Sequence, residues 1–235
     1  FAVIEDASHT VGGRYKDEAI GSCKYSDICV FSFHPVKIIT TGEGGMALTN
    51  NSQLAQKIGR LRSHGITRDP EQLSNQDPEP WWYEQIDLGL NYRMTDIQAA
   101  LGLSQMSRLD QYVAIRNQLA QRYDELLAKL PVIVPAQAKD CYSSRHLYVV
   151  RLKLDEIDKS RRQVFESLRE QGVGVQIHYI PVPSQPYYKN LGFLDEDYPH
   201  GLSYYQEAIS LPLFPTMTTE QQDKIVSVLS DILRS

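Results

Sequence analysis

The stretch FSFHPVKIITTGEGG, residues 31–45, decides the fold. It begins in a buried apolar strand predicted for residues 28–33, passes through a loop rich in glycine and threonine, and enters a strand predicted for residues 45–49. Lys37 lies on that loop, and in α/β folds ligands bind beyond the ends of buried strands. A lone lysine on a loop is usually a solvated cation, so its neighbours must decide its role.

Polar groups near Lys37 suit a ligand that carries a phosphate. The hydroxyl of Ser32 can bind a phosphate oxygen, and the glycine-rich turn lets the backbone approach a ligand closely. Upstream, a strand predicted for residues 1–4 ends in the acids Glu5 and Asp6. Such an acid can be a helix cap or a surface residue. A carboxylate beside a pyridine ring instead keeps the ring nitrogen protonated, and a lysine with such an acid is the recurring layout of pyridoxal-phosphate (PLP) sites.

The next part of the chain is predicted to be a helix followed by a long connection. Ser52 is expected to cap the helix, and Gly65 to end it. Residues 66–85 show no periodicity and include the aromatic run WWY at 81–83. These aromatic side chains could cover the core, or they could form a lid or a wall for a sugar nucleotide.

The rest of the chain is predicted to be a long helix and a smaller α+β unit. Thr95 fits a capping box, and helical periodicity follows it for about ten turns, with room for a break. Strands are expected at residues 146–154 and 173–179, with helices that begin after Ser160 and Thr218.

Charge and cysteine content exclude several classes of protein. The formal net charge of −5 offers no basic surface for nucleic acid. Cys23, Cys29 and Cys141 show neither metal-site spacing nor a disulfide framework, which predicts a reducing cytoplasm and no metal site. No apolar run is long enough for a membrane span. The chain begins with Phe1 inside a predicted strand, so we expect an N-terminal portion to be missing.

Four segments follow one another along nearly the whole chain: VIEDASHTVGG (3–13), FSFHPVKIITTGEGG (31–45), LGLNYRMTDIQAALGL (88–103) and SLPLFPTMT (210–218). In sequence and in order they resemble the DegT/DnrJ/EryC1/StrS family of sugar aminotransferases. The resemblance implies an α/β protein of the aspartate-aminotransferase architecture, fold type I. Residues 1–110 would form the C-terminal part of the large PLP-binding domain, and residues 111–235 a linking helix and a smaller α+β C-terminal domain.

The resemblance also implies a role for each matching residue. Lys37 matches the Schiff-base lysine, and Asp6 matches the acid on the pyridine nitrogen. His9 falls near the ring hydroxyl of PLP, and Ser32 matches a phosphate ligand. Asn91 matches an asparagine that reaches the phosphate of the neighbouring subunit's cofactor, which implies a homodimer with its active sites at the interface.

The segment QIHYIPVPSQPYY, residues 176–188, matches a C-terminal loop that approaches the substrate. His178 and Tyr179 are its candidate substrate-binding residues, although His178 could also be a structural histidine. The family's N-terminal part supplies a phosphate-binding turn and a ring that stacks on the cofactor. Neither has a counterpart here, so we expect these 235 residues alone to bind PLP poorly.

The activity implied by the resemblance is amino transfer from glutamate to a nucleotide-linked 4-keto-6-deoxy sugar, in surface-polysaccharide or nonulosonic-acid precursor biosynthesis. The match is nearest to the UDP-4-amino-4,6-dideoxy-N-acetyl-altrosamine transaminase branch, and perosamine- and aminoarabinose-type enzymes share much of the pattern. Two alternatives stay open. One is a PLP-dependent sugar dehydratase of the same fold, although such enzymes have histidine where this chain has Lys37. The other is a non-catalytic binding or regulatory relative.

Overall fold

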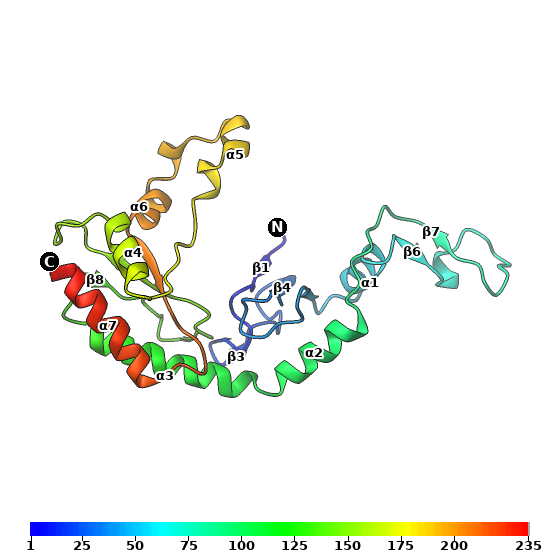
Figure 1. Cartoon of the computed structure of the whole chain (residues 1–235). Helices are drawn as coiled ribbons and strands as arrows, with labels where there is room; N and C mark the ends of the chain where they lie inside the picture. Colours follow the sequence, from blue (N-terminus) through cyan, green and yellow to red (C-terminus); the bar gives the residue numbers. More distant parts are fainter. Residues whose placement is uncertain (235) are drawn as a thin grey trace. The chain divides into compact units, whose positions relative to one another are not determined.

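The computed structural model describes residues 1–234 and divides the chain into two units (Figure 1). Unit 1 comprises Phe1–Gln111 with Asp140–Ser144. Unit 2 comprises Tyr112–Lys139 with Arg145–Ser235. In the described part of the chain, no helix is both long enough and apolar enough to span a bilayer.

The main sheet of unit 1 has three strands in the order β1–β4–β5. Strand β4 runs parallel to β1 and antiparallel to β5. The strands expected at residues 28–33 and 45–49 are confirmed. The first strand lies further along the chain than the predicted 1–4. Val3, just before it, donates to the Asp27 carboxylate and accepts from the Asp27 and Ile28 amides. The bounds are Ile4–Asp6 for β1, Ile28–Ser32 for β4 and Gly45–Leu48 for β5.

The two faces of β4 differ in burial. Cys29 and Phe31 are buried on one face, where Gly21 lies against the Phe31 ring. The outer strands β1 and β5 are largely exposed within the described residues, and Ile4 is 67% exposed. Apolar strand composition predicts that a strand will be buried, but it does not say which segment covers it.

The helices of unit 1 begin at polar caps. Helix α1, Ser52–Leu61, is capped by Asn51, whose side chain accepts hydrogen bonds from two amides of the first turn. The prediction of Ser52 as the cap is wrong by one residue, because asparagine caps a helix at least as well as serine. Helix α2, Asp96–Met106, starts with the predicted capping box at Thr95. The helical stretch then breaks, and α3 covers Leu109–Leu127.

Two small sheets complete unit 1. The connection at residues 66–85 is a hairpin in which β6 pairs with β7, and the short helix η1 lies between the two strands. The other sheet has the order β3–β2–β9. The bounds are Arg14–Tyr15 for β2, Glu18–Ala19 for β3, Ile66–Thr67 for β6, Pro70–Gln72 for η1, Glu84–Gln85 for β7 and Cys141–Tyr142 for β9.

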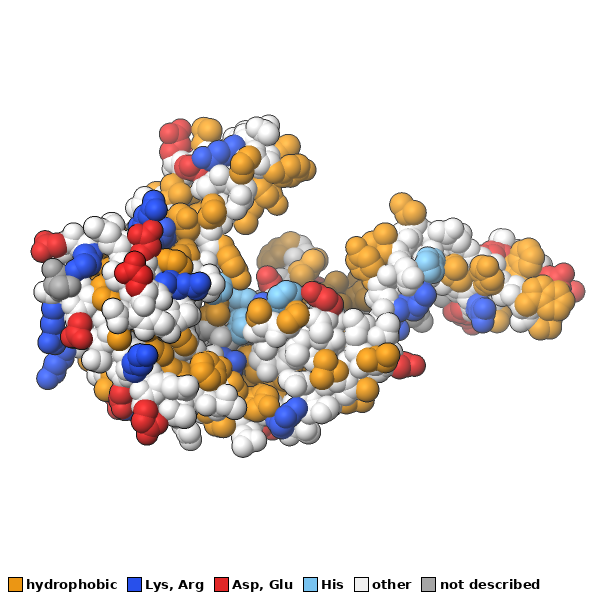
Figure 2. Space-filling view, viewed as in Figure 1, with side chains coloured by type: hydrophobic (Ala, Val, Ile, Leu, Met, Phe, Trp, Pro, Cys, Tyr) orange, Lys and Arg blue, Asp and Glu red, His pale blue; other side chains and the backbone are white. Residues whose placement is uncertain are grey.

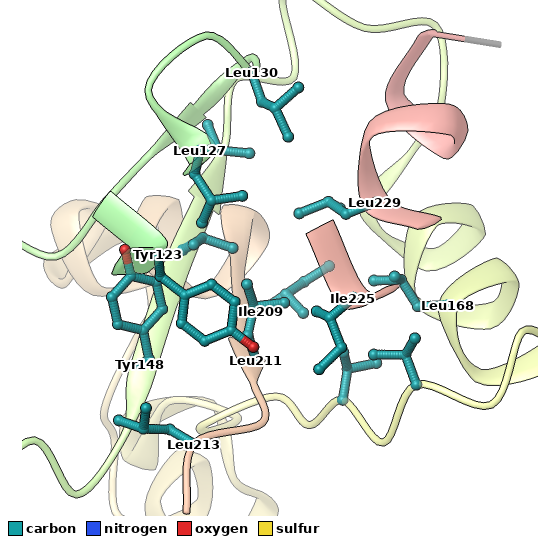
Figure 3. Packing of buried hydrophobic residues seen from close by; sticks show 14 of the residues in the cluster. Tyr123, Leu127, Leu130, Tyr148, Leu168, Ile209, Leu211, Leu213, Ile225 and Leu229 are labelled. Atoms are coloured by element: carbon teal, nitrogen blue, oxygen red, sulfur yellow. The ribbon is translucent and has the colours of Figure 1, made fainter. Parts of the chain in front are cut away.

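Unit 2 folds around an antiparallel sheet with the order β11–β10–β8. Residues of this sheet share one core with α3, α4 and α7. Figure 3 shows the Tyr123 and Tyr148 rings side by side in that core, and their centroids lie 4.8 Å apart. The bounds are Val132–Ile133 for β8, Tyr148–Leu152 for β10, Arg161–Glu170 for α4, Val182–Ser184 for η2, Pro186–Asn190 for α5, Asp195–Asp197 for η3, Pro199–Glu207 for α6, Ala208–Leu211 for β11 and Thr219–Arg234 for α7.

The expectations for unit 2 hold for the helices and fail for one strand. The capping box at Ser160 and the cap at Thr218 are confirmed. The prediction of a strand at 173–179 is wrong. There the Val175 amide bonds to the Val173 carbonyl in a tight local turn, and in this segment only Gln176 bridges to β11. Buried valines at alternate positions therefore pack into the core without a ladder.

Candidate active site

Asp6 and Ser32 lie at the same edge of the main sheet. Each is the last residue of its strand, and parallel strands end at a common edge. Asp6 is paired with Val30, which is two residues before Ser32. Because side chains alternate along a strand, Asp6 and Ser32 project from the same face, opposite to the buried Cys29 and Phe31.

The Asp6 carboxylate is held in its ionised form. The Ser8 amide donates a hydrogen bond of 3.0 Å to Asp6 Oδ1. Hydrogen bonds from Ser8 are the main reason that the pKa of Asp6 lies below its ordinary value, and the charges of His9 and Lys37 lower it further. A carboxylate that stays charged at neutral pH can keep a facing ring nitrogen protonated.

A short turn after β4 places Lys37. The Lys37 amide donates to the His34 carbonyl at 3.0 Å, and the next two residues, Ile38 and Ile39, are buried. The Thr41 amide then returns to the Phe33 carbonyl at 3.1 Å. The loop is therefore anchored on both sides of the lysine, so its side chain starts from a fixed backbone.

Lys37 and Asp6 interact electrostatically. Partial burial lowers the pKa of the Lys37 amine, and the negative charge of Asp6 opposes part of that decrease. The charge of Lys37 in turn helps to lower the pKa of Asp6. A lowered pKa increases the neutral fraction of the amine, and only the neutral amine can attack a carbonyl carbon.

Two glycines let the loop close over the end of β4. A Cβ atom at Gly44 would lie 2.4 Å from Thr41 Oγ1, and one at Gly45 would lie 2.7 Å from the Phe31 carbonyl oxygen. The Gly44 carbonyl accepts a hydrogen bond from the Phe33 amide at 2.9 Å. The glycine-rich sequence is thus required by the close approach of backbone to β4, beside Ser32.

His9 lies on the turn that follows β1. Its charge contributes to the lowered pKa of Asp6, and its carbonyl accepts a hydrogen bond from the buried Ser144 hydroxyl at 3.0 Å. Ser144 belongs to the second segment of unit 1. His9 therefore has an anchored backbone and a side chain on the Asp6 side of the site.

Asn91 occupies a different part of unit 1, where its backbone forms an isolated antiparallel β-bridge with Ser63. The amides of His64 and Tyr92 donate to the Leu90 and Arg62 carbonyls at 2.9 Å. Asn91 is exposed, and its side chain forms no hydrogen bond with the described residues. The structure fixes the Asn91 backbone, and it does not join the side chain to the Asp6–Lys37 pair.

The ladder beside Asn91 depends on two glycines in contact. A Cβ at Gly65, where φ is 71°, would lie 1.8 Å from the Asp87 carbonyl oxygen. A Cβ at Gly89 would lie 2.1 Å from the Gly65 amide nitrogen. No side chain fits between these two backbones.

Gly65→Ala is expected to destabilise the protein by about 2–4 kcal/mol, since alanine adds a backbone clash to a left-handed conformation. Denaturant unfolding measures the loss. Gly59→Ala is the matched control, because a Cβ there meets nothing within 4 Å and α1 gains helix propensity. Equal unfolding midpoints for the two variants would contradict the packing described here.

His178 and Tyr179 belong to unit 2. The Nδ1 atom of His178 lies 2.7 Å from Ser210 Oγ, and its ring contacts the Tyr179 ring edge-on at 4.6 Å between centroids. Tyr179 is 65% exposed. The structure brings these two residues together with each other and with Ser210.

The aromatic run at 81–83 lies at the end of the β6–β7 hairpin. Trp81 is 73% exposed, and Figure 2 shows hydrophobic side chains gathered over this hairpin. Glu84 organises the loop by accepting hydrogen bonds from the Ser74 and Asn75 amides and from the Trp82 indole. These bonds, that of the Ser74 amide first, lower the pKa of Glu84 to about 2.

Acidification is expected to release the Trp82 indole. The pKa of Glu84 is lowered in the fold, so the carboxylate stabilises the loop fully above the ordinary glutamate pKa of 4.5. This stabilisation is lost as the pH falls toward about 2. The chain has only two tryptophans, Trp81 and Trp82, so tryptophan fluorescence reports on this loop alone.

The fluorescence change between pH 5 and 2 is expected to disappear in Glu84→Gln and to persist in Glu79→Gln. Circular dichroism separates loop release from general unfolding. An unchanged acid transition in Glu84→Gln would show that this carboxylate does not order the loop.

Sequence reasoning missed two serines that support candidate site residues. Ser8 follows Asp6 by two residues, which is the spacing of a side-chain-to-backbone turn and could have identified it. Ser210 lies 32 residues from His178, and no local pattern joins them.

The chemical groups at this site match those that PLP needs for binding. An ionised carboxylate and a lysine with a lowered pKa interact with each other, and a hydroxyl lies at the same edge and face of the sheet as the carboxylate. Asp6, Lys37 and Ser32 would hold the ring nitrogen, the aldehyde carbon and the phosphate, respectively.

The chain belongs to the DegT/DnrJ/EryC1/StrS aminotransferase family, whose model matches residues 1–230. The family resemblance and the α/β class expected from the sequence are therefore confirmed. The chain is 35% identical over 235 residues to the spore coat polysaccharide biosynthesis protein SpsC of Bacillus subtilis. It is 37% identical over 233 residues to a UDP-4-amino-4,6-dideoxy-N-acetyl-beta-L-altrosamine transaminase of Campylobacter jejuni.

These matches cover 99% and 98% of this chain, but 60% and 58% of the relatives. A candidate sugar aminotransferase of Streptococcus pneumoniae, solved in a PMP form, superposes with a TM-score of 0.87 at 30% identity. That match covers 99% of this chain and 57% of the other. The chain thus spans less than two thirds of the length of the curated relatives it matches.

Proposed function

We propose that the protein is a PLP-dependent aminotransferase that transfers an amino group, with glutamate as donor, to a nucleotide-linked 4-keto-6-deoxy sugar. The observation that carries the proposal is the placement of Asp6 at the end of β1 and of Lys37 on the anchored loop after β4, where their charges interact. Family membership supports amino transfer, and the names of the Bacillus subtilis and Campylobacter jejuni relatives support a nucleotide sugar and a polysaccharide pathway.

Each residue of the site has a distinct task in this reaction. When bound, PLP supplies a ring that accepts electrons. Asp6, kept ionised by Ser8, would keep the ring nitrogen protonated. The Lys37 amine would hold the cofactor's aldehyde carbon and, when free, would serve as the general acid and base that moves a proton at the substrate carbon. Ser32 would hold the phosphate, and His9 would lie near the ring hydroxyl.

The proposed assembly is a cytoplasmic homodimer with its active sites at the interface. Residues 1–110 form the C-terminal part of the large cofactor-binding domain, and residues 111–235 form the linking helix and the small domain. Asn91 reaches the phosphate of the cofactor bound to the partner. His178 and Tyr179 contact the sugar nucleotide. The exposed position of Asn91 and the anchoring of its backbone support its role.

A sugar dehydratase of the same fold is the second candidate. Such enzymes replace the lysine with histidine, whereas this chain has Lys37 on an anchored loop beside Asp6. Lysine at this position favours amino transfer. A non-catalytic relative would not need the lowered pKa of Lys37 or the ionised Asp6.

The test is a half-reaction assay on the intact protein with PLP. Glutamate is expected to bleach the bound cofactor's absorption and release 2-oxoglutarate, and a panel of keto-sugar nucleotides should restore the absorption. Release of 2-oxoglutarate without restoration by any sugar nucleotide would overturn the substrate class. A protein that stays colourless with PLP and is not labelled at Lys37 by borohydride would overturn the enzyme assignment.

A further inference from the structure

Strand β11 of unit 2 contains one polar residue in an otherwise apolar, fully buried sequence. All four residues of Ala208–Leu211 are buried, and Ser210 is 5% exposed. A buried hydroxyl without a hydrogen-bond partner destabilises a fold, because it has lost its bonds to water. The described fold meets that requirement with the ring of His178, whose Nδ1 lies 2.7 Å from Ser210 Oγ.

The backbone of Ser210 fixes the segment that carries His178. The Ser210 amide donates to the Gln176 carbonyl at 2.8 Å, and the Gln176 amide donates to the Ser210 carbonyl at 3.3 Å. This bridge lies two residues before His178. One residue of β11 therefore holds both the backbone next to the histidine and the histidine ring itself.

A hydrogen bond at Nδ1 restricts rotation of the ring, whether the Ser210 hydroxyl donates to the nitrogen or accepts from it. Tyr179 packs edge-on against the same ring. A side chain held in this way reaches a substrate in one orientation, and misplacement of a positioned group weakens its contribution.

We propose that Ser210 is a positioning residue that fixes the orientation in which the His178 ring meets the sugar nucleotide. This inference rests on the proposed function, because it gives His178 a substrate to meet. Ser210 itself is buried and acts only through the histidine.

The first measurement is nitrogen NMR of the His178 ring in the intact protein with PLP. Wild type is expected to show the Nδ1 signal of a hydrogen-bonded ring nitrogen, and Ser210→Ala a signal shifted by the loss of that bond. Ser210→Thr retains a hydroxyl and should restore the wild-type spectrum. Ile209→Val is the matched control, because it removes a buried methylene group from the same strand without changing the hydroxyl.

The second measurement compares the two half-reactions. In Ser210→Ala, the KM for the sugar nucleotide is expected to rise about 5- to 10-fold, as for the loss of one hydrogen bond. The glutamate half-reaction should stay within about twofold of wild type, since only the sugar-nucleotide step is expected to use His178. Ser210→Thr should recover the sugar-nucleotide KM, and Ile209→Val should leave both half-reactions unchanged.

The proposal is overturned if the Nδ1 signal is the same in wild type and Ser210→Ala, or if that signal changes while sugar-nucleotide binding does not. An equal loss in both half-reactions, or the same loss in Ile209→Val, would also overturn it by indicating a general packing role. Failure of the proposed function is visible separately, as wild-type protein that transfers no amino group. In that case the NMR spectra and direct titration with the sugar nucleotide still decide the role of Ser210.

Discussion

Lys37→Ala is expected to lower the turnover of amino transfer by at least 10²–10⁴-fold, roughly the contribution of a positioned acid–base group. The variant loses the amine that bonds to the cofactor and the group that moves the proton, so both half-reactions should fail. The measurement is release of 2-oxoglutarate from glutamate, followed by amination of the keto-sugar nucleotide.

Lys57→Ala is the control for this variant. Lys57 is an exposed residue of α1, and its replacement should leave turnover unchanged. Lys37→Arg keeps a positive charge but cannot supply a neutral amine, so it should be as inactive as Lys37→Ala. Near-normal turnover in either Lys37 variant would refute the role of this lysine.

Asp6→Asn is expected to lower turnover on the order of 10²–10³-fold, the usual effect of removing one preorganised electrostatic partner of the reacting group. Asparagine has nearly the same shape as aspartate, so the loss would reflect the charge. The fold should persist, because Asp6 is exposed at the end of β1. The measurement is the same pair of half-reactions at saturating substrate.

A second effect of Asp6→Asn concerns Lys37 directly. The charge of Asp6 raises the pKa of the Lys37 amine, against the larger lowering by burial. Removal of that charge should therefore lower the Lys37 pKa further in protein without cofactor, as measured by the pH dependence of lysine modification. Asp17→Asn, in an exposed turn with φ of 64°, is the matched control. An unchanged Lys37 pKa in Asp6→Asn would contradict the interaction.

Local patterns predicted the elements that local chemistry determines. The capping boxes at Thr95 and Ser160 are formed by residues three apart, so the sequence shows them directly. Strand β4 was equally readable, because five residues alternate between buried and half-buried positions. The loop at the site was predicted from Gly44 and Gly45. The structure shows why glycine is needed there, since a Cβ atom at these positions would clash with Thr41 and Phe31, respectively.

Features that depend on distant partners could not be predicted. The apolar alternation at 173–179 reads as a strand, but Val173 and Val175 enter the core of unit 2 through a local turn. The link between His178 and Ser210 crosses 32 positions without a motif. The exposure of β1 and β5 could not be predicted either, because no pattern in these strands shows what covers them.

The assignment depends on Lys37 and Asp6 holding two ends of one ring, and a crystal structure of the intact protein with PLP tests this most directly. The account predicts the aldehyde carbon bonded to Lys37 Nζ, with the ring nitrogen within hydrogen-bonding distance of the Asp6 carboxylate. A cofactor attached to another lysine, or a ring nitrogen that faces away from Asp6, would contradict it.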